Sequence, residues 1–176
     1  MAVVDKQIPI LQIVGYQNSG KTTLTTKIIE LLSSEGLRIG ALKHHGHGGT
    51  PLDLSLSKDS TKHKQAGALV AAVEGEGTIQ ITASTPSFSI KSILKLYEAL
   101  EVDMIVVEGY KKLTYPKIIM VKSKEDFQSL MQLNNVVACI SWIDLASVKM
   151  KNVPIFMIQD EQLFMNWINN YIRSLL

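Results

Sequence analysis

The sequence predicts an α/β fold of three layers, in which helices cover both faces of a mostly parallel sheet with some antiparallel strands. Two observations indicate this class. Short apolar runs alternate along the chain with segments whose apolar residues recur at helical spacing. The first apolar run also leads into the glycine-bearing string GYQNSGKTT at residues 15–23. With 176 residues, 46% of them hydrophobic and 19% charged, the chain is expected to form one globular domain over residues 1–176.

The first elements form the opening of a parallel α/β unit. A buried strand is expected at residues 8–14, directly before the glycine string. A helix is expected at residues 21–35, with Gly36 as its C-terminal cap. The apolar residues with helical spacing in this segment are Leu24, Ile28, Leu31 and Leu32. A second strand is predicted at residues 37–44.

The middle of the chain predicts a hairpin between two helices. Residues 45–51 are glycine-rich and indicate a loop, and a short helix is expected near residues 58–66. Two strands, at residues 67–73 and 78–84, are joined by EGEG, so they should add antiparallel character to the sheet. Ser87 or Ser89 can cap the next helix. Its apolar face is formed by Ile90, Ile93, Leu94, Tyr97 and Leu100.

The second half continues the alternation of strands and helices. Strands are predicted at residues 103–110, 116–121, 136–141 and 154–158, and a final helix from about residue 161. This last helix is expected to bury Leu163, Phe164, Trp167, Ile168 and Ile172.

The glycine string matches G-x-x-x-x-G-K-[ST], the pattern of a phosphate-binding loop. Its glycines let backbone N–H groups surround phosphate oxygens, and the following helix adds its positive N-terminal end. The expected nucleotide-binding residues are Gly15, Tyr16, Gln17, Asn18, Ser19, Gly20, Lys21, Thr22 and Thr23. Lys21 should pair with the β- and γ-phosphates as a catalytic charge, and the Thr22 hydroxyl should hold Mg²⁺.

Two acids, Glu108 and Asp53, are candidates for the metal side of this site. Glu108 ends the strand in MIVVEG on the phosphate-loop side, so it is the expected second metal-side residue, acting through water. The alternative is a solvated acid at a strand end. Asp103 precedes that strand and lies at the wrong end. Asp53 is a candidate for the metal or for orienting the attacking water, or else a turn residue after Pro51.

A cluster of histidines follows the second strand. His44, His45 and His47 lie in KHHGHGG, with Lys43 among them. This loop leaves the sheet edge where ligands of open α/β sheets collect. The cluster could contact an anionic second ligand or a partner, could ligate a metal such as Zn²⁺ or Ni²⁺, or could be a polar loop without a ligand.

Two further features leave alternatives open. The basic segment Lys58, Lys62, His63 and Lys64 suits either a phosphorylated second ligand or a solvated helix face. The guanine-reading string N-K-x-D is absent. The nearest approximation is SKED at residues 123–126, where Asp126 is either a base reader or an ordinary acid at a helix start. The motifs alone do not decide between guanine and adenine.

Composition excludes several classes of protein. A net charge of +2 gives no reason to expect binding to nucleic acid or a membrane. The start, MAVVDKQIP, does not resemble a signal peptide, and no uncharged apolar run approaches the roughly 20 residues of a membrane span. The single cysteine, Cys139, excludes an internal disulfide and argues against a thiolate metal site. A cytoplasmic soluble protein is expected.

Four strings in order, GYQNSGKTT, KHHGHG, KDSTKHKQAGA and VEGYK, together resemble the molybdopterin-guanine dinucleotide biosynthesis protein B family, MobB. The resemblance covers roughly residues 8–122. The phosphate loop alone is shared by very many families, whereas the other three strings are selective in combination.

The resemblance implies a GTP-binding P-loop protein with weak GTPase activity and Mg²⁺ as cofactor. Family members assist the nucleotidyltransferase that attaches GMP to molybdopterin, a MobA-type partner, and are typically homodimers. Contact with molybdopterin itself is left open. Carried onto this chain, the phosphates fall to residues 15–23, Thr22 and Glu108 face Mg²⁺, and Asp53 matches the loop aspartate. Lys43, His44, His47 and Lys111 match the strings that would meet a second ligand or partner.

The residues themselves favour slow turnover and leave two other functions open. The arginines Arg38 and Arg173 lie in an early strand and the final helix, so no arginine finger is expected. No second glycine-rich nucleotide loop and no kinase-type catalytic base are found. Besides the GTP-loaded adapter, the alternatives are a GTPase metallochaperone that uses His44, His45 and His47, and a small P-loop kinase or ligase that uses ATP.

Overall fold

The computed structural model describes residues 8–44, 58–85, 88–145, 148 and 152–176. The chain divides into two compact units, one of Met1–Gly46 with Tyr97–Leu176 and one of His47–Leu96. No helix in the described part of the chain combines the length and the apolar character needed to cross a bilayer.

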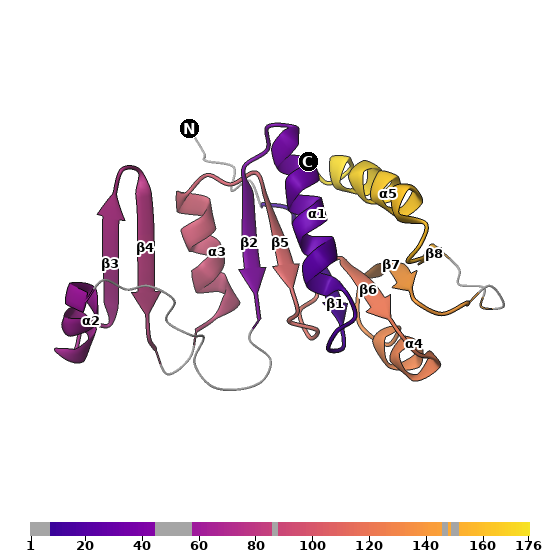
Figure 1. Cartoon of the computed structure of the whole chain (residues 1–176), viewed down its shortest axis with the longest axis horizontal. Helices are drawn as coiled ribbons and strands as arrows, with labels where there is room; N and C mark the ends of the chain where they lie inside the picture. The colour runs from indigo at the N-terminus through magenta and orange to yellow at the C-terminus, as the bar shows by residue number, and fades with distance from the viewer. Residues whose placement is uncertain (1–7, 45–57, 86–87, 146–147, 149–151) are drawn as a thin grey trace, which may run out of the picture. The chain divides into compact units, whose positions relative to one another are not determined.

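The first unit contains a six-stranded sheet in which every pair of neighbours is parallel. Its order is β2-β5-β1-β6-β7-β8 (Figure 1). The strands are β1 (Ile10–Gly15), β2 (Ile39–Lys43), β5 (Met104–Glu108), β6 (Lys117–Val121), β7 (Val136–Ser141) and β8 (Ile155–Met157). Each was predicted to within a few residues, and the class of a mostly parallel α/β sandwich is confirmed.

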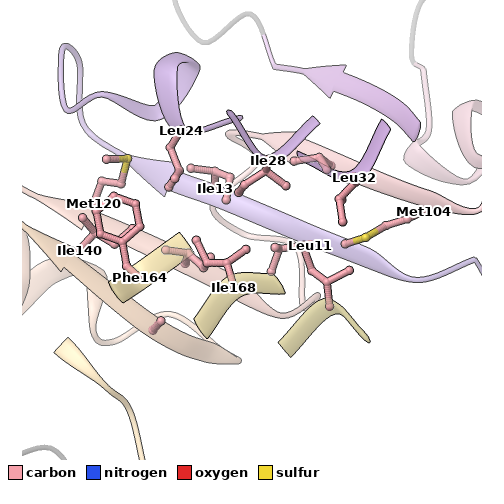
Figure 2. Packing of buried hydrophobic residues seen from close by; sticks show 14 residues of the cluster. Leu11, Ile13, Leu24, Ile28, Leu32, Met104, Met120, Ile140, Phe164 and Ile168 are labelled. Atoms are coloured by element: carbon pink, nitrogen blue, oxygen red, sulfur yellow. The ribbon is translucent and has the colours of Figure 1, made fainter. Parts of the chain in front are cut away.

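One face of this sheet packs against α1 (Lys21–Ser34) and α5 (Glu161–Arg173). Figure 2 shows Leu24, Ile28 and Leu32 of α1 gathered with Phe164 and Ile168 of α5 around alternate residues of the strands. Those strand residues include Leu11, Ile13, Met104, Met120 and Ile140. Because strand side chains alternate between faces, this one cluster fixes which residues of every strand face the two helices.

The other face of the sheet packs against α4 (Lys124–Leu130). The intervening strand residues Val14, Ile119, Val121 and Cys139 are fully buried there with Leu130. Burial raises the pKa of the Cys139 thiol to about 12, so the thiol stays protonated at neutral pH. The two clusters therefore give the sheet helices on both faces, the expected three layers.

The final helix corrects one prediction. Phe164, Ile168 and Ile172 are buried and Trp167 is half-buried, but Leu163 is 61% exposed. Leu163 precedes Phe164 by one residue, which rotates it about 100° around the helix and away from the sheet. The apolar stripe of α5 is therefore narrower than the sequence predicted.

The second unit holds α2 (Lys58–Gln65), the strands β3 (Val70–Gly75) and β4 (Thr78–Ala83), and most of α3 (Ile90–Ala99). β3 and β4 form the predicted antiparallel hairpin, with Glu76 and Gly77 at its turn. The sequence had suggested that these two strands join the main sheet. In the structure they form a separate two-stranded sheet. Ser89 caps α3, since its hydroxyl accepts a hydrogen bond from the Ser92 N–H at 3.2 Å.

Candidate functional site

The loop between β1 and α1 has a backbone that requires glycine at both ends. A Cβ on Gly15 would lie 2.5 Å from Ser19 Oγ and 2.8 Å from the Met120 carbonyl oxygen. Gly20 has φ of 95°, and Asn18 has φ of 57°. Because Gly20 is the N-cap of α1, it offers no capping side chain, so the first N–H groups of the helix remain as donors at the loop.

Lys21 spans this loop. Its ammonium group donates to the Tyr16 carbonyl oxygen at 2.7 Å. Burial lowers the pKa of Lys21 below its usual value; Glu108 opposes this shift, whereas Lys111 and Lys43 reinforce it. Three lysines therefore act on one small region, and an anion bound there would be attracted by all of them.

Thr22, Glu108 and Lys43 form a second cluster next to the loop. The Thr22 hydroxyl lies 2.9 and 3.1 Å from the two carboxylate oxygens of Glu108. Lys43 Nζ lies 3.1 Å from Thr22 Oγ1 and 3.1 Å from Glu108 Oε1. Parallel pairing explains the convergence, because Glu108 is in register with Lys43 of β2 and Ile13 of β1 at the carboxyl ends of the strands.

The donor set of this cluster fits a hard divalent cation. Glu108 is 7% exposed and its carboxylate faces a hydroxyl, and oxygen ligands of this kind suit Mg²⁺. Thr22 and Glu108 are the residues that would hold the ion. The ammonium of Lys43 lies in this cluster, and its predicted contact with a second ligand or partner stays a prediction.

The turn after β5 packs around His44 and the phosphate loop. His44 N–H donates to the Glu108 carbonyl at 2.9 Å, and its ring centroid lies 4.3 Å from that of Tyr110. Gly109 has φ of 90°, and a Cβ there would lie 3.0 Å from His44 Cβ. Lys111 Nζ lies 3.4 Å from the centroid of the Tyr16 ring, a cation–π contact. The VEGYK string therefore touches both the histidine string and the loop.

The remaining predicted site residues either lie outside the described part of the chain or have other contacts. His45, His47 and Asp53 lie outside the described residues. Within the residues that the structure describes, no group of three His, Cys, Asp or Glu side chains could hold a metal ion. Asp126 has capping contacts, because its carboxylate accepts from Lys122 N–H at 3.0 Å and its own N–H donates to Ser123 Oγ at 3.1 Å.

Two polar contacts at the loop were not predicted from the sequence. The indole N–H of Trp142 donates to the Ser19 carbonyl at 2.9 Å. Gln12, fully buried in β1, donates from Nε2 to the carbonyls of Gly109 and Tyr110 at 3.1 and 3.0 Å. A glutamine inside an otherwise apolar strand was the available signal for the second contact. No local pattern marked the first, because its partners are 123 residues apart.

Comparison with known proteins gives a consistent result. The family model "MobB: Molybdopterin guanine dinucleotide synthesis protein B" matches residues 10–142. A Bacillus subtilis protein named "Probable molybdopterin-guanine dinucleotide biosynthesis adapter protein" is 42% identical over 160 residues, which cover 91% of each chain. The Haemophilus influenzae adapter protein is 28% identical over 174 residues, covering 96% of this chain and 94% of its own.

Solved structures show the same relationship. The crystal structure of Bacillus subtilis MobB has a TM-score of 0.77 and 39% identity, and the match covers 92% of this chain and 97% of that one. The MobB homologue from Bacillus stearothermophilus has a TM-score of 0.76 and 34% identity, and the match covers 94% of this chain and 98% of that one.

Proposed function

The chain belongs to the MobB family, and from this premise we propose that it is a GTP-binding adapter with weak GTPase activity. Its role is that of an accessory protein in molybdopterin guanine dinucleotide biosynthesis, the role that its relatives carry in their names. The partner that it assists is proposed to be a MobA-type nucleotidyltransferase, which attaches GMP to molybdopterin. The proposal includes a single nucleotide-binding domain, residues 1–176, in the cytoplasm.

The observation that carries the proposal is the cluster of Lys21, Thr22 and Glu108 beside an uncapped helix start. A bound triphosphate would accept hydrogen bonds from backbone N–H groups at the start of α1, where Gly20 provides no capping side chain, and would pair with the ammonium of Lys21. Mg²⁺ would be held by Thr22 and Glu108 and would neutralise phosphate charge. Gly15, Tyr16, Gln17, Asn18, Ser19, Gly20 and Thr23 complete the proposed phosphate loop. Asp53, as a residue that orients water, stays a prediction.

The positions of the two arginines favour binding over rapid hydrolysis. Arg38 pairs with Glu101 and Asp103, and Asp103 precedes β5, at the end of the strand opposite Glu108. Arg173 pairs with Glu35. Neither guanidinium group lies at the loop, and such a group accelerates phosphoryl transfer by about 10³–10⁵-fold. A chain that retains its triphosphate suits an adapter whose nucleotide state another protein senses.

The histidine string and Lys111 are proposed as a contact for the transferase or its pterin. His44 is exposed next to Tyr110, and Lys111 lies over Tyr16 at the rim of the loop. Lys111 contacts Tyr16 of the phosphate loop, so a partner that binds Lys111 and His44 would lie next to the bound nucleotide. The metallochaperone alternative is not favoured, because the relatives are named as adapter proteins of molybdopterin-guanine dinucleotide biosynthesis.

The decisive experiment is calorimetric titration with GTP and ATP in the presence of Mg²⁺. Wild type is expected to prefer GTP, and Lys21→Ala is expected to weaken GTP binding by about 100-fold, because a charge-assisted contact to phosphate is lost. Lys27→Ala is the matched control: Lys27 lies on the same helix but pairs with Glu161. It should leave the affinity unchanged.

Two outcomes would overturn the proposal. A preference for ATP would contradict the GTP-binding adapter and would favour a P-loop kinase or ligase. Equal weakening by Lys21→Ala and Lys27→Ala would show that the loop does not hold the triphosphate. The adapter role itself is tested by co-purification with the MobA-type transferase, which should form a complex with wild type.

A further inference from the structure

The sheet order restricts where the base of a bound nucleotide can lie. β5 and β2 lie on one side of β1, and β6 and β7 lie on the other (Figure 1). The Thr22–Glu108–Lys43 cluster belongs to the first side. A Mg²⁺ ion held by Thr22 and Glu108 would neutralise the charge of the terminal phosphates, so we expect these phosphates on the first side as well. The nucleoside is attached to the other end of the triphosphate, at the α-phosphate. It should therefore extend over the carboxyl ends of β6 and β7.

Trp142 is the first residue after β7, and it touches the phosphate loop. Besides the hydrogen bond from its indole N–H to the Ser19 carbonyl, its Cζ2 lies 3.7 Å from the position of a Cβ on Gly20. Trp142 is nevertheless 48% exposed. A large apolar ring is thus held in one orientation beside the loop while much of its surface remains open to a flat ligand.

The turn that carries Trp142 is fixed by local hydrogen bonds. Ser141 is fully buried; its hydroxyl donates to the Ile143 carbonyl at 2.7 Å and accepts from the Ile143 N–H at 3.1 Å. The Trp142 N–H donates to the Val121 carbonyl at the end of β6. These hydrogen bonds hold the backbone on both sides of Trp142. The next residue after this turn is Asp144, which is exposed.

Asp144 has the chemistry that distinguishes guanine from adenine. The guanine edge presents the N1–H and the 2-amino group side by side, and one carboxylate can accept both hydrogen bonds. Adenine presents an acceptor at N1, which a carboxylate repels. The segment Ser141, Trp142, Ile143, Asp144 keeps the acid at the fourth position of N-K-x-D, although its first and second residues differ.

We propose that Trp142 and Asp144 form the guanine-binding site of this protein, with the indole ring packed against the base and the carboxylate accepting from its N1–H and 2-amino group. This inference rests on the proposed function, since it needs a nucleotide whose phosphates lie in the loop. It adds the residues that select the base, which the loop itself cannot do.

The first test exchanges Asp144 for asparagine and compares GTP with xanthosine triphosphate. Xanthine carries a carbonyl oxygen where guanine carries the 2-amino group, so it needs a donor opposite that position, and the side-chain amide introduced by the substitution supplies one. Asp144→Asn should lower the affinity for GTP by about 5- to 150-fold, the range for a bidentate contact to a base edge. The affinity for xanthosine triphosphate should rise. Asp160→Asn, which changes an acid beyond the end of β8, is the matched control and should preserve the GTP preference.

Inorganic tripolyphosphate with Mg²⁺ separates failure of this inference from failure of the proposed function. Wild type and Asp144→Asn should bind it equally, because it has no base. If wild type binds neither tripolyphosphate nor GTP, the phosphate site itself is absent. If wild type binds both, and Asp144→Asn leaves the ratio of GTP to xanthosine triphosphate affinity unchanged, the base site is wrong while the adapter proposal stands.

The second test uses the fluorescence of Trp142. The chain has two tryptophans, and Trp167→Phe removes the other, which packs between Phe156 and Tyr171. In that variant GTP should quench the remaining emission, whereas tripolyphosphate should change it far less. Equal responses to the two ligands would overturn the contact between the indole and the base.

Discussion

The ammonium group of Lys43 lies where it would influence any cation bound to Thr22 and Glu108. It is 3.1 Å from an oxygen of each residue, so it already neutralises part of the charge that would attract Mg²⁺. In the nucleotide-free protein Lys43 therefore competes with a divalent ion for the same oxygens. Because Lys43 is largely exposed, solvent screens this competition and its effect should be modest.

Lys43→Met is expected to tighten the binding of Mn²⁺, used as a probe for Mg²⁺, to the nucleotide-free protein by about 3- to 10-fold, since one nearby positive charge is removed. The measurement is the free Mn²⁺ signal in electron paramagnetic resonance. Lys27→Met, on the outer surface of α1, is the control for the loss of one charge elsewhere. If Lys43→Met binds Mn²⁺ more weakly than this control does, Lys43 does not compete with the divalent ion for the oxygens of Thr22 and Glu108.

At the residue scale, the sequence could predict contacts whose partners belong to motifs. The phosphate-loop pattern placed Thr22 at the start of a helix, and the strand reading placed Glu108 at the same sheet edge; the structure brings their side chains to 2.9 Å. Trp142 could not be predicted in this way. Its contact with Ser19 depends on β6 lying between β1 and β7, and that order is a property of the whole sheet.

Gly15 illustrates how an element sets the shape of the loop that follows it. β1 is paired with β6 up to Gly15 itself, whose register partner is Met120. A side chain at Gly15 would therefore meet the Met120 carbonyl, which belongs to a backbone held by a neighbouring strand and cannot move aside easily. β1 can continue into the loop this close to the Met120 carbonyl only if residue 15 has no Cβ.

Gly15→Ala is expected to lower the free energy of unfolding by about 1–3 kcal/mol, the usual cost of forcing an added methyl group into a packed site. It should also weaken GTP binding, because the loop must shift. Gly75→Ala is the control, since a Cβ there would have open space. Chemical denaturation and GTP titration measure the two effects. Equal stability of both variants would show that the loop yields without cost.

Helices and strands were predicted well where the spacing of apolar residues defines them. They were predicted less well where contacts between distant parts of the chain determine their position. The central strands β1, β5 and β6 are buried on both faces, and their apolar runs were visible in the sequence. The hairpin was also visible, but the choice between joining that sheet and forming its own depends on contacts that no local pattern encodes. Leu163 fits the apolar pattern of α5 but faces away from the core.

At the scale of the whole molecule, the hairpin of β3 and β4 favours assembly. Cross-strand register places Val70, Ala72, Ile79 and Ile81 on one face of this two-stranded sheet, with Glu74 at its turn end, and Val70, Ile79 and Ile81 are exposed. Two strands alone are marginally stable in water, and an apolar face of this kind is usually covered. The homodimer that the family resemblance implies would cover it, because a two-fold axis lets one apolar face pack against itself.

Ile79→Lys should convert a homodimer into monomers, because it replaces an exposed apolar side chain of this face with a charged one. The substitution is chosen to spare the hairpin, since Ile79 lies opposite Glu74 and a lysine there gains an oppositely charged cross-strand neighbour. Thr78→Lys is the matched control: it adds the same charge at the adjacent residue, on the opposite face of the sheet. Sedimentation velocity should show wild type and Thr78→Lys as dimers and Ile79→Lys as a monomer with an unchanged circular dichroism spectrum. If wild type sediments as a monomer, or if Ile79→Lys remains dimeric, the apolar face of the hairpin is not the contact between copies.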